Sequence, residues 1–252
     1  MRHHRSIVVA ALIAASCSIP ALAGAEGHVS VGAILWRHST PLQVRSATDF
    51  DGSSMTAGER AKSWDIEGSG VGARLTYELP RLLTIYGEAG TSQATVSDKD
   101  VTSPGQSVET RGMNGGAFYG LGVQIGDYFT PTSNLFWRVG GSVSVLATGL
   151  DQDVTTSWDY DETKLGFDAK IGGWVDQVGF YGGVRMVHAS ADLKENDRSN
   201  LPGFQTRTTE LERDGSVDLL VGAQTRGSDV SGFAELGMVG TFSATAGLTM
   251  RF

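Results

Sequence analysis

Apolar side chains recur at every second position through most of this chain. One such segment places Val71, Ala73, Leu75, Tyr77 and Leu79 on one face, and the residues between them are small, polar or charged. A period of two is that of a β-strand, whereas a helix repeats its apolar positions about every 3.6 residues. The pattern therefore predicts an all-β chain.

The alternation divides the chain into about ten strands, with eight or twelve as the alternatives. Residues 230–252 keep one parity throughout, but a single strand of that length would measure roughly 75 Å at about 3.3 Å per residue. We therefore expect a tight hairpin near Val239-Gly240-Thr241. The predicted strands are 28–37, 64–79, 82–96, 113–126, 134–147, 160–175, 178–192, 210–225, 230–239 and 243–252.

The second face of these strands is rich in glycine. The chain has 34 Gly in 252 residues, about twice the usual share of roughly 7%. A soluble sandwich packs its apolar face inward and usually has longer polar side chains outside. A transmembrane barrel reverses that layout, and a narrow one needs small residues inside. We therefore predict a closed antiparallel transmembrane β-barrel.

The segments between the predicted strands alternate between short and long. The long ones, at 38–62, 97–112, 149–161 and 193–210, carry many charges. Short periplasmic turns alternating with long external loops are typical of outer-membrane barrels. Proline cannot donate a ladder hydrogen bond, and all five prolines after residue 23 fall in predicted connections: Pro41, Pro80, Pro104, Pro131 and Pro202.

The N-terminus has the pattern of an export signal. Arg2 and Arg5 precede the apolar run 7–15, and Ala21-Leu22-Ala23 forms a small-residue cleavage site. We expect residues 1–23 to be a cleaved signal peptide and residues 24–252 to form the barrel. Cleavage after Ala25 and lipidation of Cys17 are the alternatives.

Cleavage would leave an acidic chain without cysteine. Cys17 is the single cysteine, so no disulfide, thiol nucleophile or thiolate metal site would remain. The signal holds two of the 20 basic residues and none of the 28 acidic ones, so the net charge would fall from −8 to −10. Such a chain lacks the basic patch of a nucleic-acid-binding protein.

The signal, the alternating strands and the terminal Phe252 together resemble Gram-negative outer-membrane β-barrel proteins, of the porin-like or surface-antigen type. Leu248 and Met250 share the face of Phe252. In that family the C-terminal aromatic strand is recognised by the barrel-assembly machinery. The resemblance implies location in the cell outer membrane and contact with its lipid and lipopolysaccharide.

Ten charged residues fall on the face that should point into the lumen. Five acids and five bases favour a network of ion pairs that fills the barrel over a path for solutes, since buried charges need partners. A ten-stranded lumen is narrow enough for side chains to fill. The predicted lumen residues are Arg74, Glu78, Glu88, Arg138, Asp168, Lys170, Arg185, Asp218, Glu235 and Arg251.

Five acidic residues cluster in and beside one predicted long connection. Asp151, Asp153, Asp159, Asp161 and Glu162 could offer oxygen ligands to a divalent cation, but their spacing fits no calcium loop, which favours a solvated acidic loop. We therefore expect no metal and no cofactor.

Omptin proteases, which are ten-stranded barrels, provide the enzyme hypothesis. Their pattern is two external Asp near one strand top and an Asp–His pair on another. This chain has Asp98 and Asp100 above the third strand and His188 and Asp192 above the seventh, but no Asp-x-His. The missing pair argues against protease activity.

The sequence therefore predicts a non-enzymatic outer-membrane surface protein that presents four long charged loops and has a mostly filled lumen. A narrow channel for small solutes is the first alternative, and an omptin-like hydrolase is the second. A small solute or a surface partner could bind at the loops.

Overall fold

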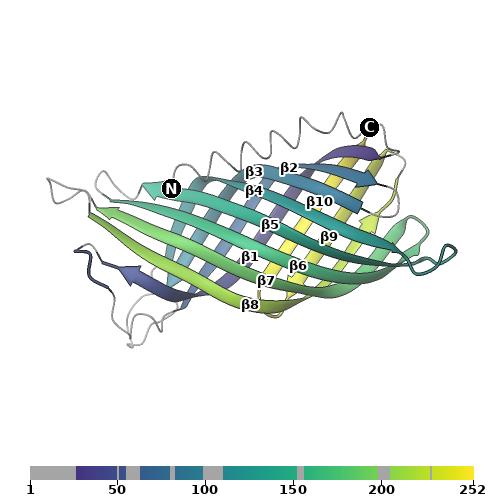
Figure 1. Cartoon of the computed structure of the whole chain (residues 1–252). Helices are drawn as coiled ribbons and strands as arrows, with labels where there is room; N and C mark the ends of the chain where they lie inside the picture. Colours follow the sequence, from purple (N-terminus) through teal and green to yellow (C-terminus); the bar gives the residue numbers. More distant parts are fainter. Residues whose placement is uncertain are drawn as a thin grey trace.

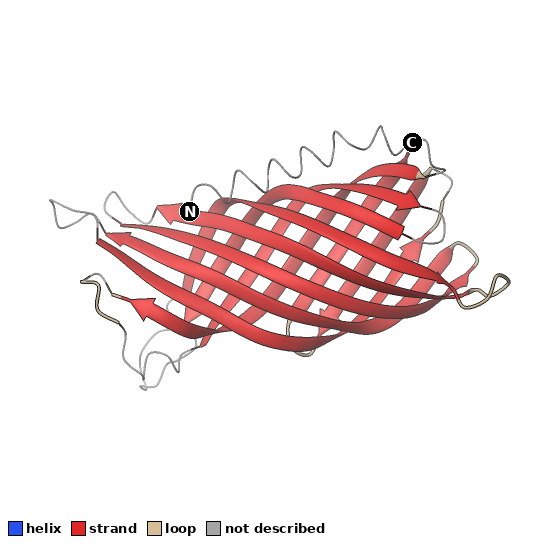
Figure 2. Ribbon diagram, viewed as in Figure 1, coloured by secondary structure: helices blue, strands red, loops and turns tan. Residues whose placement is uncertain are grey.

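The computed structural model describes residues 27–49, 51–54, 63–79, 83–98, 110–151, 156–197, 205–227 and 229–252. These residues form one closed antiparallel barrel (Figures 1 and 2). Each strand pairs with the next along the chain, and β1 closes the ring against β10. The strands are β1 (His28–Thr48), β2 (Ser63–Leu79), β3 (Leu83–Asp98), β4 (Thr110–Tyr128), β5 (Leu135–Asp151), β6 (Thr156–Val175), β7 (Val178–Asp197), β8 (Gln205–Thr225), β9 (Val230–Met238) and β10 (Phe242–Arg251).

The all-β class and the ten-strand count are confirmed, as is the hairpin between β9 and β10. Within the described ranges, no helix is long and apolar enough to cross a membrane. The predicted signal peptide, with its cleavage residues Ala21 and Ala23, lies outside the described residues.

The predicted long loops are wrong in extent, because strands run into each of them. β1 continues to Thr48, β5 to Asp151 and β7 to Asp197, while β6 already begins at Thr156. Strands β1 to β8 have 16 to 21 residues. The hydrocarbon needs only about 9–11 residues of a tilted strand, so these strands extend well beyond the membrane.

β-bulges change which face the alternating side chains occupy in three of the strands. Register shifts occur between Val44 and Ser46 of β1, between Asn114 and Ala117 of β4, and opposite Val187 in the β7–β8 pair. An extra residue in one strand moves the following side chains to the opposite face. In β4 the bulge contains Gly115, whose φ of 78° suits glycine. The inward face therefore changes from odd to even positions, or the reverse, within β1, β4 and β8. Counting every second residue no longer identifies that face along the whole strand.

The half of the barrel next to the short turns has an apolar outer belt. We call this part the membrane half. Its exposed apolar side chains come from every strand and include Val31, Leu35, Val71, Ile85, Val123, Ile125, Val139, Leu165, Phe167, Ile171, Val184, Met186, Val217, Leu219, Leu236, Met238, Phe242, Leu248 and Met250. The inward face between them is polar or small, as the reversed layout of a membrane barrel requires.

The other half, which we call the outer half, has the opposite layout. Its interior is a core of buried apolar side chains, including Leu42, Val44, Ile66, Val96, Met113, Trp158, Tyr160, Leu193 and Leu211. Its exposed outward positions are polar and include Arg37, Gln43, Arg45, Glu67, Gln93, Asp159, Thr163, Ser190 and Glu210. This half is built like a barrel that stands in water.

The strand number also differs between the halves. β9 and β10 have 9 and 10 residues and end before the outer half begins, as the short yellow strands in Figure 1 show. Beyond the ends of these two strands, β1 pairs directly with β8, from Gln43 opposite Glu212 to Thr48 opposite Thr208. Arg45 and Glu212, 2.9 Å apart, add an ion pair to this seam. Ten strands therefore enclose the membrane half, and eight enclose the outer half.

The tip of the β9–β10 hairpin contains Val239 with a φ of 108°. A β-branched residue is strained at positive φ, so Val239→Gly is expected to raise the free energy of unfolding by about 1 kcal/mol. Urea unfolding in lipid vesicles, followed by tryptophan fluorescence, measures this change. Val221→Gly is the control, because Val221 is lipid-exposed within β8 and glycine should cost about 1 kcal/mol there. Equal losses in both variants would contradict the strain.

Candidate functional site

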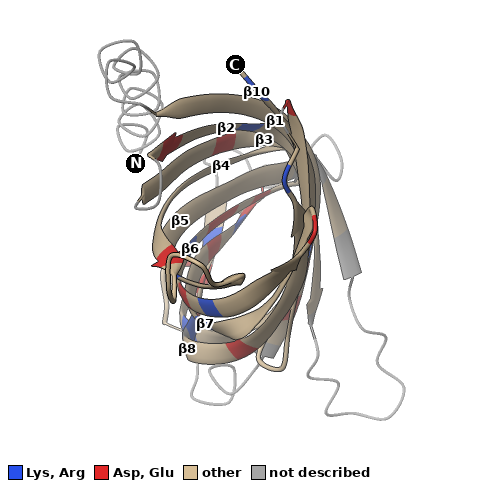
Figure 3. Cartoon of the chain, turned by 90° about the vertical axis from the view of Figure 1, so that its right-hand side faces the viewer, with Lys and Arg blue, Asp and Glu red and all other residues tan. Residues whose placement is uncertain are grey.

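The lumen of the membrane half contains a cavity of about 730 Å³. Its lining runs from Asp229 and Arg251, at the short-turn end, to His38 and Glu162 beneath the apolar core. Figure 3 looks along the barrel from the short-turn end and shows acidic and basic positions on strands around the ring. The cavity is thus a charged chamber with an apolar roof.

Arg74 and Glu88 form one ion pair on the chamber wall. They lie opposite each other on β2 and β3, and Arg74 Nε donates to Glu88 Oε1 at 2.6 Å. The Arg74 guanidinium also lies over two rings, 4.3 Å from the centroid of Phe233 and 4.7 Å from that of Tyr86. Because Phe233 belongs to β9, this stack joins strands that are not neighbours in the ring.

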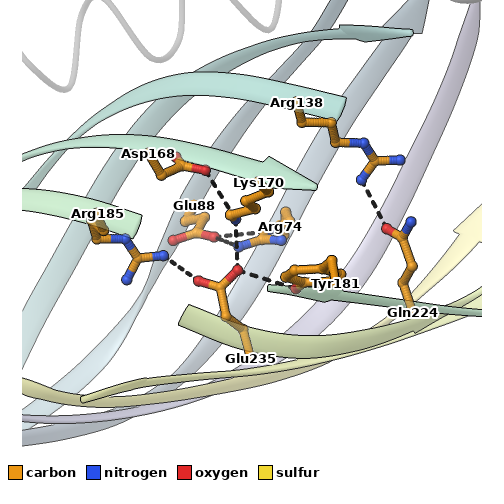
Figure 4. Close-up of polar contacts among 9 residues, drawn as sticks. All are labelled: Arg74, Glu88, Arg138, Asp168, Lys170, Tyr181, Arg185, Gln224 and Glu235. Atoms are coloured by element: carbon orange, nitrogen blue, oxygen red, sulfur yellow. Dashed lines mark hydrogen bonds and ion pairs between the residues drawn. The ribbon is translucent and has the colours of Figure 1, made fainter. Parts of the chain in front are cut away.

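Glu235 is the centre of a second cluster, which crosses the lumen (Figure 4). It accepts hydrogen bonds from Lys170 Nζ at 2.6 Å, from the Tyr181 hydroxyl at 3.1 Å and from Arg185 Nη2. Lys170 also lies 3.1 Å from Asp168 Oδ2. Glu235 is on β9, Lys170 on β6 and Arg185 on β7, so one carboxylate ties three strands together across the lumen.

Arg138 has a different environment from the other lumen bases. Its Nη1 donates to the amide oxygen of Gln224 at 2.8 Å, which connects β5 to β8 across the chamber (Figure 4). The guanidinium lies 5.1 Å from the centroid of the Phe136 ring. Charge balance across the sequence could not show that this arginine would bond to an amide.

The remaining three predicted lumen residues lie outside the central clusters. Arg251 and Glu78 are 3.5 Å apart at the short-turn mouth, where both side chains are about half exposed. Asp218 is fully buried, but it accepts hydrogen bonds from the backbone of the β9–β10 tip. The hairpin tip, which ends beside Asp218, is a partner that strand parity could not predict.

A cluster beneath the roof was missed by the sequence analysis. Glu162 Oε2 lies 3.3 Å from His38 Nε2, and Glu162 Oε1 lies 3.2 Å from Lys164 Nζ. The His38 ring stacks on Trp36 with centroids 5.2 Å apart. The sequence places His38 in the predicted connection 38–62 and groups Glu162 with a solvated acidic loop. Extending the inward parity of Asp168 back through Glu162 along β6 would have placed Glu162 in the lumen.

Among the described residues of the candidate acidic metal site, the carboxylates do not converge on one place. Asp159 and Asp161 have the outward parity of β6, whereas Glu162 is buried inside. The side chain of Asp151, and all of Asp153, lie outside what the structure describes. In the described ranges, no group of three or more metal-ligating side chains is present.

Two of the residues that would form an omptin-like site, His188 and Asp192, point away from the lumen. His188 is on the outward face of β7, with Nε2 3.9 Å from Glu212 Oε1. Asp192 follows on the same face. The side chain of Asp98, and all of Asp100, lie outside the described residues.

The terminal strand places its signal residues on the lipid-facing side. Leu248, Met250 and Phe252 are 64%, 57% and 82% exposed, which puts three large apolar side chains in a row on the outside of β10. Phe252 N donates to Val29 O at 3.0 Å, so the chain end is fixed beside the start of β1.

Comparison with solved structures identifies the fold. OmpT, the outer-membrane protease of Escherichia coli, aligns over 90% of this chain and 96% of its own, with 10% identity and a TM-score of 0.50. OprG of Pseudomonas aeruginosa aligns over 90% and 99%, with 13% identity and a TM-score of 0.48. No protein-family model matches the chain, and no curated protein matches it significantly in sequence.

The chain has the fold of Gram-negative outer-membrane β-barrel proteins. The apolar belt and the polar lumen agree with that fold and place the membrane half in the outer membrane. At this level of identity the similarity says nothing about activity.

We predict that Glu235→Ala lowers the free energy of unfolding by about 3 kcal/mol, because it leaves the buried Lys170 and the partly buried Arg185 without their shared acceptor. Equilibrium unfolding in vesicles measures the loss. Glu78→Ala is the matched control, since its pair with Arg251 is half exposed and should be worth less than about 1 kcal/mol. Similar losses in the two variants would show that the central cluster does not hold the wall.

Proposed function

We propose that this protein is a non-conducting, non-enzymatic surface barrel of the outer membrane. Its membrane half anchors the chain, and its outer half is a rigid stalk that presents the connecting segments to the surroundings. The observation that carries the proposal is the apolar core that fills the outer half.

The core opposes passage of ions because most of its buried side chains are apolar. Leu42, Ile66, Val96 and Met113 are 0% exposed, and Leu211 is 1% exposed. These side chains come from five different strands, so they meet from around the ring. Moving a hydrated ion through such packing costs many kcal/mol.

The charged clusters also narrow the lumen in the membrane half, below the apolar core. Contacts from Lys170 to Glu235 and from Arg138 to Gln224 connect strands three places apart in the ring. These contacts cross the chamber and reduce the width that is left for a solute below the roof. This supports a filled lumen over the narrow channel.

The outer half has the dimensions of a stalk. From Arg37 to Thr48, β1 runs beyond the apolar belt, which corresponds to a height on the order of 30 Å for a tilted strand. Paired strands with a packed core form a stiff support. We therefore propose that the stalk holds the outer connections clear of the lipopolysaccharide surface, where a cell-surface or host partner could reach them.

The membrane half and the terminal strand agree with the proposed partners. Outer-membrane lipid would cover the belt, and lipopolysaccharide would surround the lower part of the stalk. The exposed apolar row of Leu248, Met250 and Phe252 suits recognition by the barrel-assembly machinery before insertion.

Planar bilayers test the filled lumen. The native, folded protein is expected to give no resolved single-channel steps, because the apolar roof blocks ions. A general porin in the same bilayers controls for insertion, and the mobility shift on boiling verifies the fold. Regular steps of constant size from the heat-modifiable form would establish the channel instead.

Hydrolase activity is tested separately with the barrel in vesicles that contain lipopolysaccharide. Mass spectrometry is expected to find added peptides and phospholipids unchanged. The relevant control is His188→Ala, which alters the outward histidine without touching the lumen. Cleavage by the native protein that this variant loses would establish the enzyme.

A further inference from the structure

Two of the basic residues that line the chamber have no carboxylate partner within the described ranges. Arg138 donates from Nη1 to the amide oxygen of Gln224 at 2.8 Å, and Arg226 donates from Nη2 to a backbone oxygen at 3.0 Å. Every other Lys or Arg on the lining forms an ion pair, the longest of which joins Arg251 and Glu78 at 3.5 Å. Arg226 is exposed at the rim, whereas Arg138 is partly buried. Inside the lumen, Arg138 therefore has an amide where the other bases have an acid.

The Gln224 amide leaves a second donor unused beside Arg138. A guanidinium has only N–H donors, so it fixes the Gln224 amide with the oxygen toward Arg138. The amide nitrogen, Nε2, is buried, and no described residue accepts a hydrogen bond from it. In Figure 4 this nitrogen lies on the same side of the contact as the terminal guanidinium nitrogen that does not bond to Gln224. Because a buried donor without an acceptor costs free energy, this pair of side chains needs an acceptor.

Aromatic rings hold both arginines without supplying that acceptor. The Arg138 guanidinium lies 5.1 Å from the centroid of Phe136, and the Arg226 guanidinium lies 4.6 Å from that of Trp174. The two rings contact each other, with centroids 5.9 Å apart. Neither a Phe nor a Trp side chain offers an oxygen to a donor. The stack therefore positions the guanidinium groups and leaves the acceptor to come from elsewhere.

The chamber offers a guest both room and an entrance. Its volume of about 730 Å³ falls within the range of roughly 300–1,000 Å³ that is usual for small-molecule sites. Its lining reaches Arg226, Asp229 and Arg251 at the short-turn end, and the apolar core closes the other end. Short turns of outer-membrane barrels face the periplasm, so a guest would arrive from there.

We propose that Arg138 and Gln224 bind the carboxylate of a small organic acid that enters the chamber from the periplasm. A planar carboxylate has two oxygens, which can accept from the guanidinium edge and from the amide nitrogen together. Glu78 and Glu235 line the same chamber and oppose a second negative charge, which favours a monocarboxylate over phosphate. Arg226, at the rim, attracts the anion toward the entrance.

The carboxylate site goes beyond the proposed surface function and does not depend on it. It lies on the short-turn side of the roof, so a guest enters and leaves by the same end. A conducting barrel would overturn the proposed function and leave the site intact, whereas a barrel that binds no carboxylate would do the reverse.

Fluorine NMR tests the site with trifluorobutyrate, whose signal has no background from protein or detergent. The folded barrel is purified in an uncharged detergent, which leaves both ends of the lumen in contact with water. The line width of the probe over a titration gives its Kd. Trifluorobutyramide, the neutral amide of similar size, is the control ligand and is expected to show no saturable broadening.

Two variants remove the site in different ways. Arg138→Gln is expected to weaken trifluorobutyrate binding by between about tenfold and a hundredfold, the effect of a lost charge-assisted hydrogen bond. Gln224→Glu has the shape of the native side chain and is expected to abolish binding, because Arg138 then has a carboxylate within the chain. This second variant should unfold no more easily than the native protein, and heat-modifiable migration verifies that each variant is folded.

Arg251→Gln is the matched control for charge. It removes the same charge from the half-exposed pair at the mouth and should change the Kd by only about twofold. Equal losses in Arg138→Gln and Arg251→Gln would overturn the proposal, because the probe would then respond to the general charge of the lumen.

Three further results would also overturn the proposal. If trifluorobutyrate shows no saturable binding, water alone satisfies the two donors. If the neutral amide binds as tightly as the acid, the site does not recognise a carboxylate. Acetate is expected to displace the probe more strongly than inorganic phosphate does, and the opposite order would make this a phosphate site.

Discussion

The same wall must satisfy two different solvents. In the hydrocarbon, side chains that point outward have to be apolar, and in water above it they have to be polar. The barrel meets both demands by reversing its layout along its axis, with Val31 and Leu35 outside in the membrane half and Leu42 and Val44 inside in the outer half. In β1 both sets are reached in one continuous strand, because its outward positions change from apolar to polar after Leu35. The lumen is open where its surroundings are apolar and closed where they are aqueous.

The change from ten strands to eight follows from that reversal. An apolar core packs well only if the walls are close enough for side chains to meet, and fewer strands give a narrower ring. The β9–β10 hairpin stops at the boundary and lets β1 and β8 join above it. Its end would leave polar backbone groups unpaired in the wall. Asp218 satisfies two of them, which explains why a carboxylate predicted for the lumen network is used at the hairpin tip instead.

Most of the fold could be predicted from the sequence, because strand alternation reports directly on which face meets lipid. The class, the ten strands and the hairpin at Val239–Thr241 all follow from parity. The outer ends of the strands could not be predicted, because bulges such as that at Gly115 shift the parity and the reversed layout makes Leu42 resemble a loop residue. The ion-pair partners of the lumen residues could not be predicted either. Parity puts Glu235 inside, but only the ring closure shows that Lys170 and Arg185 reach it from β6 and β7.

The interior charges are confined to the membrane half, and their position bears on what that half does. Ion pairs in a membrane barrel cost desolvation energy that apolar side chains of similar size would avoid, and the outer half shows that this chain can pack an apolar interior. The membrane half keeps its charges around a chamber that begins at the short-turn end and stops at the cluster of His38, Glu162 and Lys164. If the barrel were only an anchor, the same core could continue down to the mouth. A polar chamber below an apolar roof is what a barrel needs when its lumen is reached from the short-turn end and closed toward the outer half.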